Sequence, residues 1–93
     1  MKVGVLTVQF RLHTTNSLKD KRSLIKHFIH QLQQKFNVSV AEVNHQDDKR
    51  RATLGIAYVG TDAQFVNRAL SKISSYCDQL PDSDVEDVHL EVW

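Results

Sequence analysis

Cysteine, proline and glycine are scarce in this 93-residue chain, which contains one cysteine, one proline and three glycines. A single thiol, Cys77, excludes an internal disulfide and an iron–sulfur cluster, because both need several cysteines. The chain also lacks repeats and low-complexity tracts, and its 41% hydrophobic and 25% charged residues are typical of a globular protein. The length predicts a single domain covering residues 1–93.

Long apolar runs are absent as well. No stretch of about 18 apolar residues occurs, so the sequence predicts no membrane-spanning helix. The first ten residues alternate apolar with polar side chains, which differs from the pattern of a signal peptide. Together with the lone cysteine, these features indicate a protein of the reducing cytoplasm.

What the chain does contain is a regular order of apolar patterns. Alternating or β-branched residues predict four strands, at 3–12, 38–43, 51–60 and 85–93. Apolar residues spaced by three and four predict two helices, at 17–36 and 61–80. The order βαββαβ predicts an α+β fold of the ferredoxin-like kind, a four-stranded antiparallel sheet with two helices on one face.

Local signals predict where the helices begin and end. Ser17 precedes Asp20 by three residues, and Thr61 precedes Gln64 by three, so each pair is expected to cap a helix N-terminus. Asn37 is expected to close the first helix in a left-handed conformation. Pro81 is expected to end the second, because proline disfavours helix at the residue before it.

Charge is distributed unevenly along the chain. Residues 1–51 contain ten Lys/Arg and four Asp/Glu, whereas residues 52–93 contain two and seven. The net charge of +1 therefore conceals a basic half and an acidic half. Such asymmetry favours a surface that meets a charged partner, although solvation alone also accounts for it.

Three runs closely resemble the YlxP-like family of small bacterial proteins: SLKDKRS from Ser17, FNVSVAEVNHQD from Phe36 and RATLGIA from Arg51. The likeness covers essentially the whole chain. It departs from the family pattern at Asp20, usually Glu, and at Asn44, usually Asp. The resemblance implies a ferredoxin-like fold and a bacterial cytosolic protein. Its members are often encoded beside transcription-termination and translation-initiation factors.

Basic residues are expected to converge where the first helix starts and the 44–50 loop turns, because these segments share one end of a βαββαβ sheet. Lysine and arginine beside a helix N-terminus suit phosphate. An acidic stretch, Asp78 to Asp84, is expected near the same end and would weaken the field. The predicted nucleic-acid contacts are Lys19, Lys21, Arg22, Lys26, Arg50 and Arg51.

Other chemistries find little support. The predicted open sheet face lacks the aromatic residues with which RNA-recognition motifs stack bases, so it is a candidate dimer surface instead. His27 and His30 lie on one helix without a ligand motif, so no metal is assigned. The loop from Leu12 to Ser17 lacks the glycine-rich phosphate loop of acylphosphatases. Cys77 is expected to be an inert core thiol.

The hypothesis from sequence is a non-catalytic, cofactor-free binding protein that docks on structured RNA, with the ribosome suggested by the resemblance. The alternative is a protein–protein module, homodimeric through the open sheet face. Two residues are left with open assignments. Glu42 stands in an otherwise apolar strand and either faces solvent or pairs with a partner's basic residue. Trp93 is expected to cover an edge of the core, although an exposed indole there would mark an interface.

Overall fold

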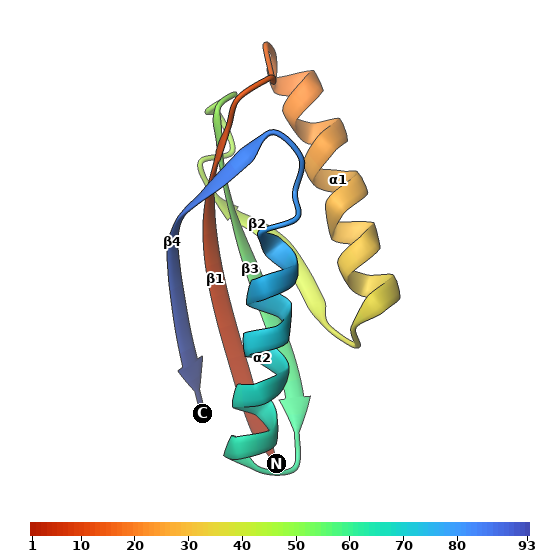
Figure 1. The fold of residues 1–93 in the computed structure, drawn as a ribbon, viewed down its shortest axis with the longest axis vertical. Coiled ribbons are helices and arrows are strands. Elements are labelled where there is room, and N and C mark those ends of the chain that lie inside the picture. Colours follow the sequence, from red (N-terminus) through yellow and green to blue (C-terminus); the bar gives the residue numbers. More distant parts are fainter.

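The protein folds as the βαββαβ order predicts (Figure 1). The structure is a computed structural model that describes all 93 residues. Its elements are β1 (Lys2–Leu12), α1 (Leu18–Lys35), β2 (Ser39–Asn44), β3 (Arg51–Gly60), α2 (Ala63–Cys77) and β4 (Ser83–Val92). The ferredoxin-like α+β prediction is confirmed.

The four strands form one antiparallel sheet in the order β2-β3-β1-β4. Both helices cover the same face of this sheet, and the other face is open (Figure 1). The end of β1, the start of α1, the β2–β3 hairpin and the start of β4 lie at one end of the molecule, as predicted. Neither helix is both long enough and apolar enough to cross a membrane.

The core lies between the sheet and the helices because side chains alternate along β1. Leu6, Val8 and Phe10 point toward the helices and are fully buried. The helices, β3 and Leu80 complete a cluster of 15 buried residues. The two helices also meet through aromatic rings, since Phe28 of α1 stacks on Tyr76 of α2 at a centroid distance of 5.8 Å.

The predicted cap of the first helix is confirmed, and the other local signals are off by a few residues. Ser17 Oγ accepts a hydrogen bond from Asp20 N, and the Asp20 carboxylate accepts one from Asn16 N. The second helix is capped by Asp62, not Thr61, because Asp62 Oδ1 accepts from Phe65 N at 2.9 Å. The sequence offered two adjacent capping residues, and the carboxylate is the one that reaches the backbone.

The boundary predictions at Asn37 and at the last strand are also corrected. The C-cap of α1 is Phe36, whose backbone is extended, so Asn37 does not close the helix in a left-handed turn. β4 starts at Ser83 instead of residue 85, because its first residues pair with the end of β1. The left-handed positions outside glycine are His45 and Asp82, both in turns.

Candidate functional site

Lys21 lies in the interior of the protein. Its side chain is 0% exposed, on the side of α1 that packs on the sheet. The ammonium Nζ donates to three backbone carbonyls of the β2–β3 hairpin, at 2.6 Å to His45, 3.2 Å to Gln46 and 3.2 Å to Arg51. Lys21 therefore joins the first turn of α1 to both ends of the hairpin loop.

Glu42 supplies the opposite charge to this ammonium. Its Oε2 lies 2.9 Å from Lys21 Nζ, and its side chain is 18% exposed. An ammonium has three N–H bonds, and the three carbonyls occupy them, so Glu42 Oε2 acts through its charge without a directed hydrogen bond. Glu42 thus pairs with a lysine of its own chain. It neither faces solvent nor needs a basic residue of a partner protein, the two roles suggested by the sequence.

The prediction that Lys21 contacts phosphate is therefore wrong. A helical position beside Ile25 and Phe28 turned its side chain into the protein, where burying an ammonium requires a neutralising carboxylate and hydrogen-bond acceptors. Two of the runs that carry the family resemblance meet at this ion pair, with Lys21 from the first run and Glu42 from the second. At these positions the shared sequence serves the fold.

Arg50 is held by the loop that joins β1 to α1. Its Nη1 donates to His13 O at 3.2 Å, and its Nη2 donates to Asn16 Oδ1 at 3.1 Å. The same loop is tied to the hairpin by buried Thr15, whose hydroxyl donates to Lys49 O at 2.6 Å. The Arg50 side chain is exposed, but its guanidinium already donates these two hydrogen bonds. We therefore remove Arg50 from the set of predicted nucleic-acid contacts.

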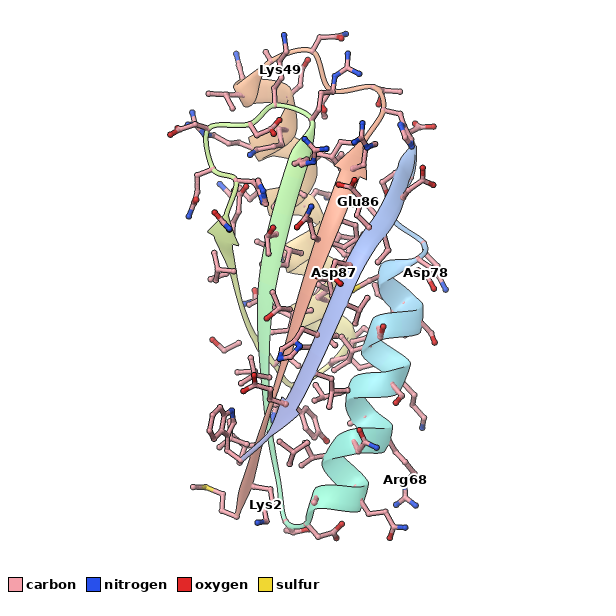
Figure 2. The ribbon with its side chains drawn as sticks, turned by 90° about the vertical axis from the view of Figure 1, so that its left-hand side faces the viewer. Lys2, Lys49, Arg68, Asp78, Glu86 and Asp87 are labelled. Atoms are coloured by element: carbon pink, nitrogen blue, oxygen red, sulfur yellow. The ribbon has the colours of Figure 1, made fainter.

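Arg51 belongs to an ionic cluster on the open sheet face. Arg11 of β1 and Arg51 of β3 stand directly opposite each other, which places two like charges side by side. Glu86 of β4 bridges them, with Oε2 3.3 Å from Arg11 Nε and Oε1 3.2 Å from Arg51 Nε (Figure 2). The charge of Arg51 is thus neutralised on the sheet face away from the helices. We therefore remove Arg51 as well from the set of predicted nucleic-acid contacts.

A β-bulge places Glu86 in this position. Gln9 pairs with Asp87 and Phe10 with Val85, so Glu86 is the extra residue of β4. A hydrogen bond from Gln9 holds the pKa of Glu86 below its usual value, and hydrogen bonds from the two arginines act in the same direction. The sequence signal for this bulge is the pair Glu86-Asp87, which breaks the period-two alternation of the strand.

The end of the molecule that was predicted to be basic is electrically balanced. Segments 11–22, 42–51 and 82–86, which meet there, contain seven Lys/Arg and seven Asp/Glu. The expected acidic neighbours are present, since His13 Nε2 lies 2.8 Å from Asp84 Oδ2. The basic residues do approach one another, but carboxylates from the hairpin and β4 offset them.

Charge is segregated between the helices and the rest of the fold. The helices contain one Asp/Glu, Asp20, and seven of the twelve Lys/Arg: Lys19, Lys21, Arg22, Lys26, Lys35, Arg68 and Lys72. The helices therefore carry a formal charge of +6, and the strands and loops carry −5. The asymmetry along the sequence has become an asymmetry across the fold.

Three of these cations form a line on the outer side of α1, which we call the α1 stripe: Lys19, Arg22 and Lys26. They are spaced by three and four residues and lie opposite the buried face of the helix. All three are exposed and make no ion pair or side-chain hydrogen bond. They are the members of the predicted set that the structure leaves free. Lys26 also borders a surface depression of about 310 Å³ with Ser23, His27 and His30.

A second basic feature, which the sequence reading missed, lies between the helices. This interhelical groove of about 450 Å³ is lined by Lys35, Phe36, Asn37, Tyr58, Phe65, Arg68, Ala69 and Lys72. A neighbouring hollow shares Lys35, Phe36 and Lys72 and continues to Tyr76. The groove contains three cations and no carboxylate.

The sequence did carry a signal for the groove. Phe65, Arg68, Lys72 and Tyr76 are spaced by three, four and four residues, so one flank of α2 carries two basic residues between two aromatic ones. Phe65 is one of the apolar residues whose helical spacing predicts this helix, but its side chain is 42% exposed. The buried residues of α2 are Val66, Leu70, Ile73 and Cys77.

Groups that could perform catalysis or hold a metal are few. No cluster of three or more His, Cys, Asp or Glu side chains could hold a metal ion. Cys77 is fully buried, as predicted, and burial raises the pKa of its thiol to about 12, with a smaller contribution from the neighbouring Asp78 charge. The thiol is therefore protonated at neutral pH and unsuited to act as a nucleophile.

The open sheet face carries small and moderately apolar residues in its middle. Trp93 was predicted to cover an edge of the core, and that prediction is wrong. Its backbone pairs with Val3, which places the indole on the open face, and its side chain is 69% exposed. Val59, opposite Val3 on β3, is 58% exposed, so these residues form an apolar patch at one end of the face.

Comparison with known proteins identifies the family. Residues 3–90 match the family described as "Protein of unknown function (DUF503)". The chain is also 30% identical over 80 residues to "Uncharacterized protein YlxP" of Bacillus subtilis (strain 168), an alignment that covers 86% of this chain and 87% of the relative. The chain therefore belongs to the YlxP-like family, DUF503, whose function is unknown.

Proposed function

We propose that this protein is a non-catalytic RNA-binding protein of the bacterial cytoplasm, which docks its helix layer on the phosphates of structured RNA. Ribosomal RNA is the first candidate. The observation that carries the proposal is the segregation of charge: seven of twelve Lys/Arg stand on two helices that contain a single carboxylate. The surface differs from the one expected from sequence, which lay at the hairpin end.

The α1 stripe supplies the contacts. Lys19 and Lys26 are seven residues apart, which is a rise of about 10 Å along the helix. Three exposed cations on this length, with Asp20 as the one nearby acid in the helix, present unneutralised charge to a phosphate backbone. Binding to phosphates releases condensed counterions, so affinity is expected to fall steeply as salt increases.

The chemistry of the rest of the chain supports binding over catalysis. An acid–base or nucleophilic site needs convergent polar groups with matched pKa values in a cleft. The buried thiol is protonated, and the carboxylates whose pKa is perturbed, Asp48 and Glu86, are engaged with backbone N–H or arginine groups at the surface.

The test is fluorescence-anisotropy binding to structured ribosomal RNA fragments between about 50 and 200 mM salt. The variant Lys19→Ala/Arg22→Ala/Lys26→Ala removes three phosphate contacts. It is expected to flatten the slope of log affinity against log salt by about 2 to 3, since each contact contributes about 0.7 to 0.9. The control is Lys2→Ala/Lys49→Ala, which removes two exposed lysines outside the helices (Figure 2).

Micromolar binding by the wild type, lost in the stripe variant and retained in the control, would support the proposal. Losses that are equal per removed charge in the two variants would show that net charge alone governs binding. Absence of binding at 50 mM salt would exclude direct docking on these RNAs.

A second candidate function is a homodimer formed through the open sheet face. The observation that favours it is the apolar patch of Val3, Val59 and Trp93, in which the indole is 69% exposed. Large exposed apolar side chains grouped on one face are typical of interfaces. A second copy of the chain offers the same patch, as a twofold contact requires.

Sedimentation velocity at several protein concentrations tests this alternative. A dimer that Trp93→Ala converts to a monomer would support the sheet-face interface. A wild-type monomer at about 100 μM would exclude it as a stable state.

A further inference from the structure

The interhelical groove has an aromatic floor and one aromatic wall. Tyr58 projects from the helix-covered side of β3, and Phe65 projects from the first turns of α2. Their ring centroids are 6.2 Å apart and the rings are inclined by 40°. Phe65 is 42% exposed, so part of its face is available to a ligand.

Cations surround this aromatic surface. Arg68 and Lys72 stand on α2 beside Phe65, and Lys35 stands at the end of α1 on the other side. None of them makes an ion pair, although Lys35 Nζ lies 5.1 Å from the centre of the Tyr76 ring. Arg68 lies toward the start of α2, at the opposite end of the molecule from Lys49 (Figure 2). Their charge is therefore free to neutralise an anionic ligand.

The lining also carries neutral hydrogen-bonding groups. Asn37 offers an amide with two donors and an acceptor at the end of α1. The groove volume of about 450 Å³ falls within the range of roughly 300 to 1,000 Å³ usual for small-ligand sites. A flat ring, a polar edge and a negative group together match this lining.

We infer that the interhelical groove binds one unpaired nucleotide of an RNA, with its base on Phe65 and Tyr58 and its phosphates on Arg68, Lys72 and Lys35. This inference rests on the proposed function, which it deepens by naming a second contact on the same helix layer. Aromatic side chains interleaved with cations are the usual means by which proteins bind unstacked bases. A purely acidic ligand would use the cations and leave the exposed ring of Phe65 without a role.

The groove and the α1 stripe belong to the same layer, so one RNA can reach both. The stripe would follow the backbone of a folded region, and the groove would take a base that protrudes from a loop or an end. The expected ligands are therefore RNAs in which unpaired nucleotides lie next to a double-helical segment.

The experiment measures anisotropy of a fluorescein-labelled six-nucleotide single-stranded RNA and of a blunt-ended RNA duplex of two complementary strands. Phe65→Leu keeps an apolar side chain and removes the aromatic face. It is expected to weaken single-strand binding by between about 5-fold and about 100-fold, while Phe65→Trp preserves it. Arg68→Ala/Lys72→Ala is expected to reduce the single-strand salt slope by about 1.4.

Trp93→Leu is the matched control, because it removes an exposed aromatic ring from the opposite face of the sheet. It is expected to leave single-strand affinity unchanged. The blunt-ended duplex is expected to bind Phe65→Leu as tightly as the wild type, because all of its bases are paired and stacked. Thermal unfolding by circular dichroism verifies that each variant is folded.

Single-strand affinity that is equal for the wild type and Phe65→Leu would overturn the groove assignment. If the α1 stripe variant still lost duplex binding in that case, the proposed function would stand without the groove. If a hexaglutamate peptide displaced the single strand as well as unlabelled RNA does, the groove would select only negative charge, and the nucleotide assignment would again be overturned.

Discussion

Lys19 and Lys21 stand two residues apart in α1, and the helix turns them to opposite sides. Lys19 is exposed and unpaired, whereas Lys21 is fully buried against the hairpin. The same residue type therefore serves two purposes within one short run of sequence. The residue type alone does not distinguish a cation that can bind a ligand from a structural one. The hydrogen-bond acceptors around each ammonium distinguish them.

Replacing Lys21 with methionine is expected to destabilise the protein by about 3 to 5 kcal/mol, because the carboxylate of Glu42 is left without its counter-charge in a mostly buried position. Chemical denaturation gives the free energy of unfolding. Lys19→Met, an identical change at an exposed position, is the control and is expected to stay within about 0.5 kcal/mol of the wild type. Equal stabilities for the two variants would refute the structural role of Lys21.

Glu86 is expected to make stability depend on pH in the acidic range. Its pKa is lowered in the folded protein by hydrogen bonds from Gln9, Arg51 and Arg11. A depressed folded pKa contributes stability that is present above the ordinary carboxylate pKa of 4.5 and is lost as pH falls through the folded value. Denaturation midpoints between pH 7 and pH 2.5 are therefore expected to decline.

The variant Glu86→Gln is expected to be less stable at pH 7 and to lose less stability on acidification than the wild type. Asp87→Asn changes the adjacent carboxylate of β4, which makes no ion pair, and serves as the control (Figure 2). An unchanged pH profile in Glu86→Gln would assign the acid sensitivity to other groups, such as Asp48, whose pKa is also lowered.

At the scale of elements, α2 lies very close to β1, and a glycine makes this possible. A Cβ atom at Gly4 would collide with side-chain atoms of Val66 and Leu70, both fully buried on α2. This close packing fixes α2 against the sheet and so determines which flank of α2 faces α1. The position of the groove wall therefore depends on Gly4.

Gly4→Ala is expected to lower the free energy of unfolding by about 1 to 3 kcal/mol through overpacking. Gly55→Ala is the control, since the Cβ there would meet Val43, a side chain that is 51% exposed and able to move aside. Thermal unfolding of both variants measures the difference. A Gly4→Ala variant as stable as Gly55→Ala would show that the contact relaxes at no cost.

The elements themselves could be predicted from sequence because each depends on a local period. The alternation of Leu6, Val8 and Phe10 and the helical spacing of Ile25, Phe28 and Leu32 each point to one buried face, and the structure places them there. Caps were less certain, because Thr61 and Asp62 both have suitable side chains and only the folded backbone selects between them.

The site could be predicted only in part, because its charges are decided by contacts that are distant in sequence. Lys21 is neutralised by Glu42 and bound by carbonyls 24 to 30 residues away. Arg51 is neutralised by Glu86, 35 residues away. No local pattern reveals such partners. The α1 stripe could be predicted from the sequence because its three cations belong to one helix, and their exposure follows from the helical spacing.

At the scale of the whole molecule, the fold converts a sequence asymmetry into a layered one. The helices carry +6 and the strands and loops carry −5, so the molecule is nearly neutral although its helices are basic. A molecule of this kind is oriented by the field of a polyanion, with its helices toward the anion and its β4 edge away. We therefore expect RNA to approach the protein from the side of the helices.

The most direct test of that prediction is a ¹⁵N–¹H NMR titration of the protein with a structured ribosomal RNA fragment at about 50 mM salt. We expect chemical-shift changes to concentrate on the outer residues of α1 and on the α1-facing flank of α2, including Arg22, Lys26, Arg68 and Lys72. Changes concentrated on β4 or on the open sheet face around Trp93, with the helices unaffected, would contradict the account.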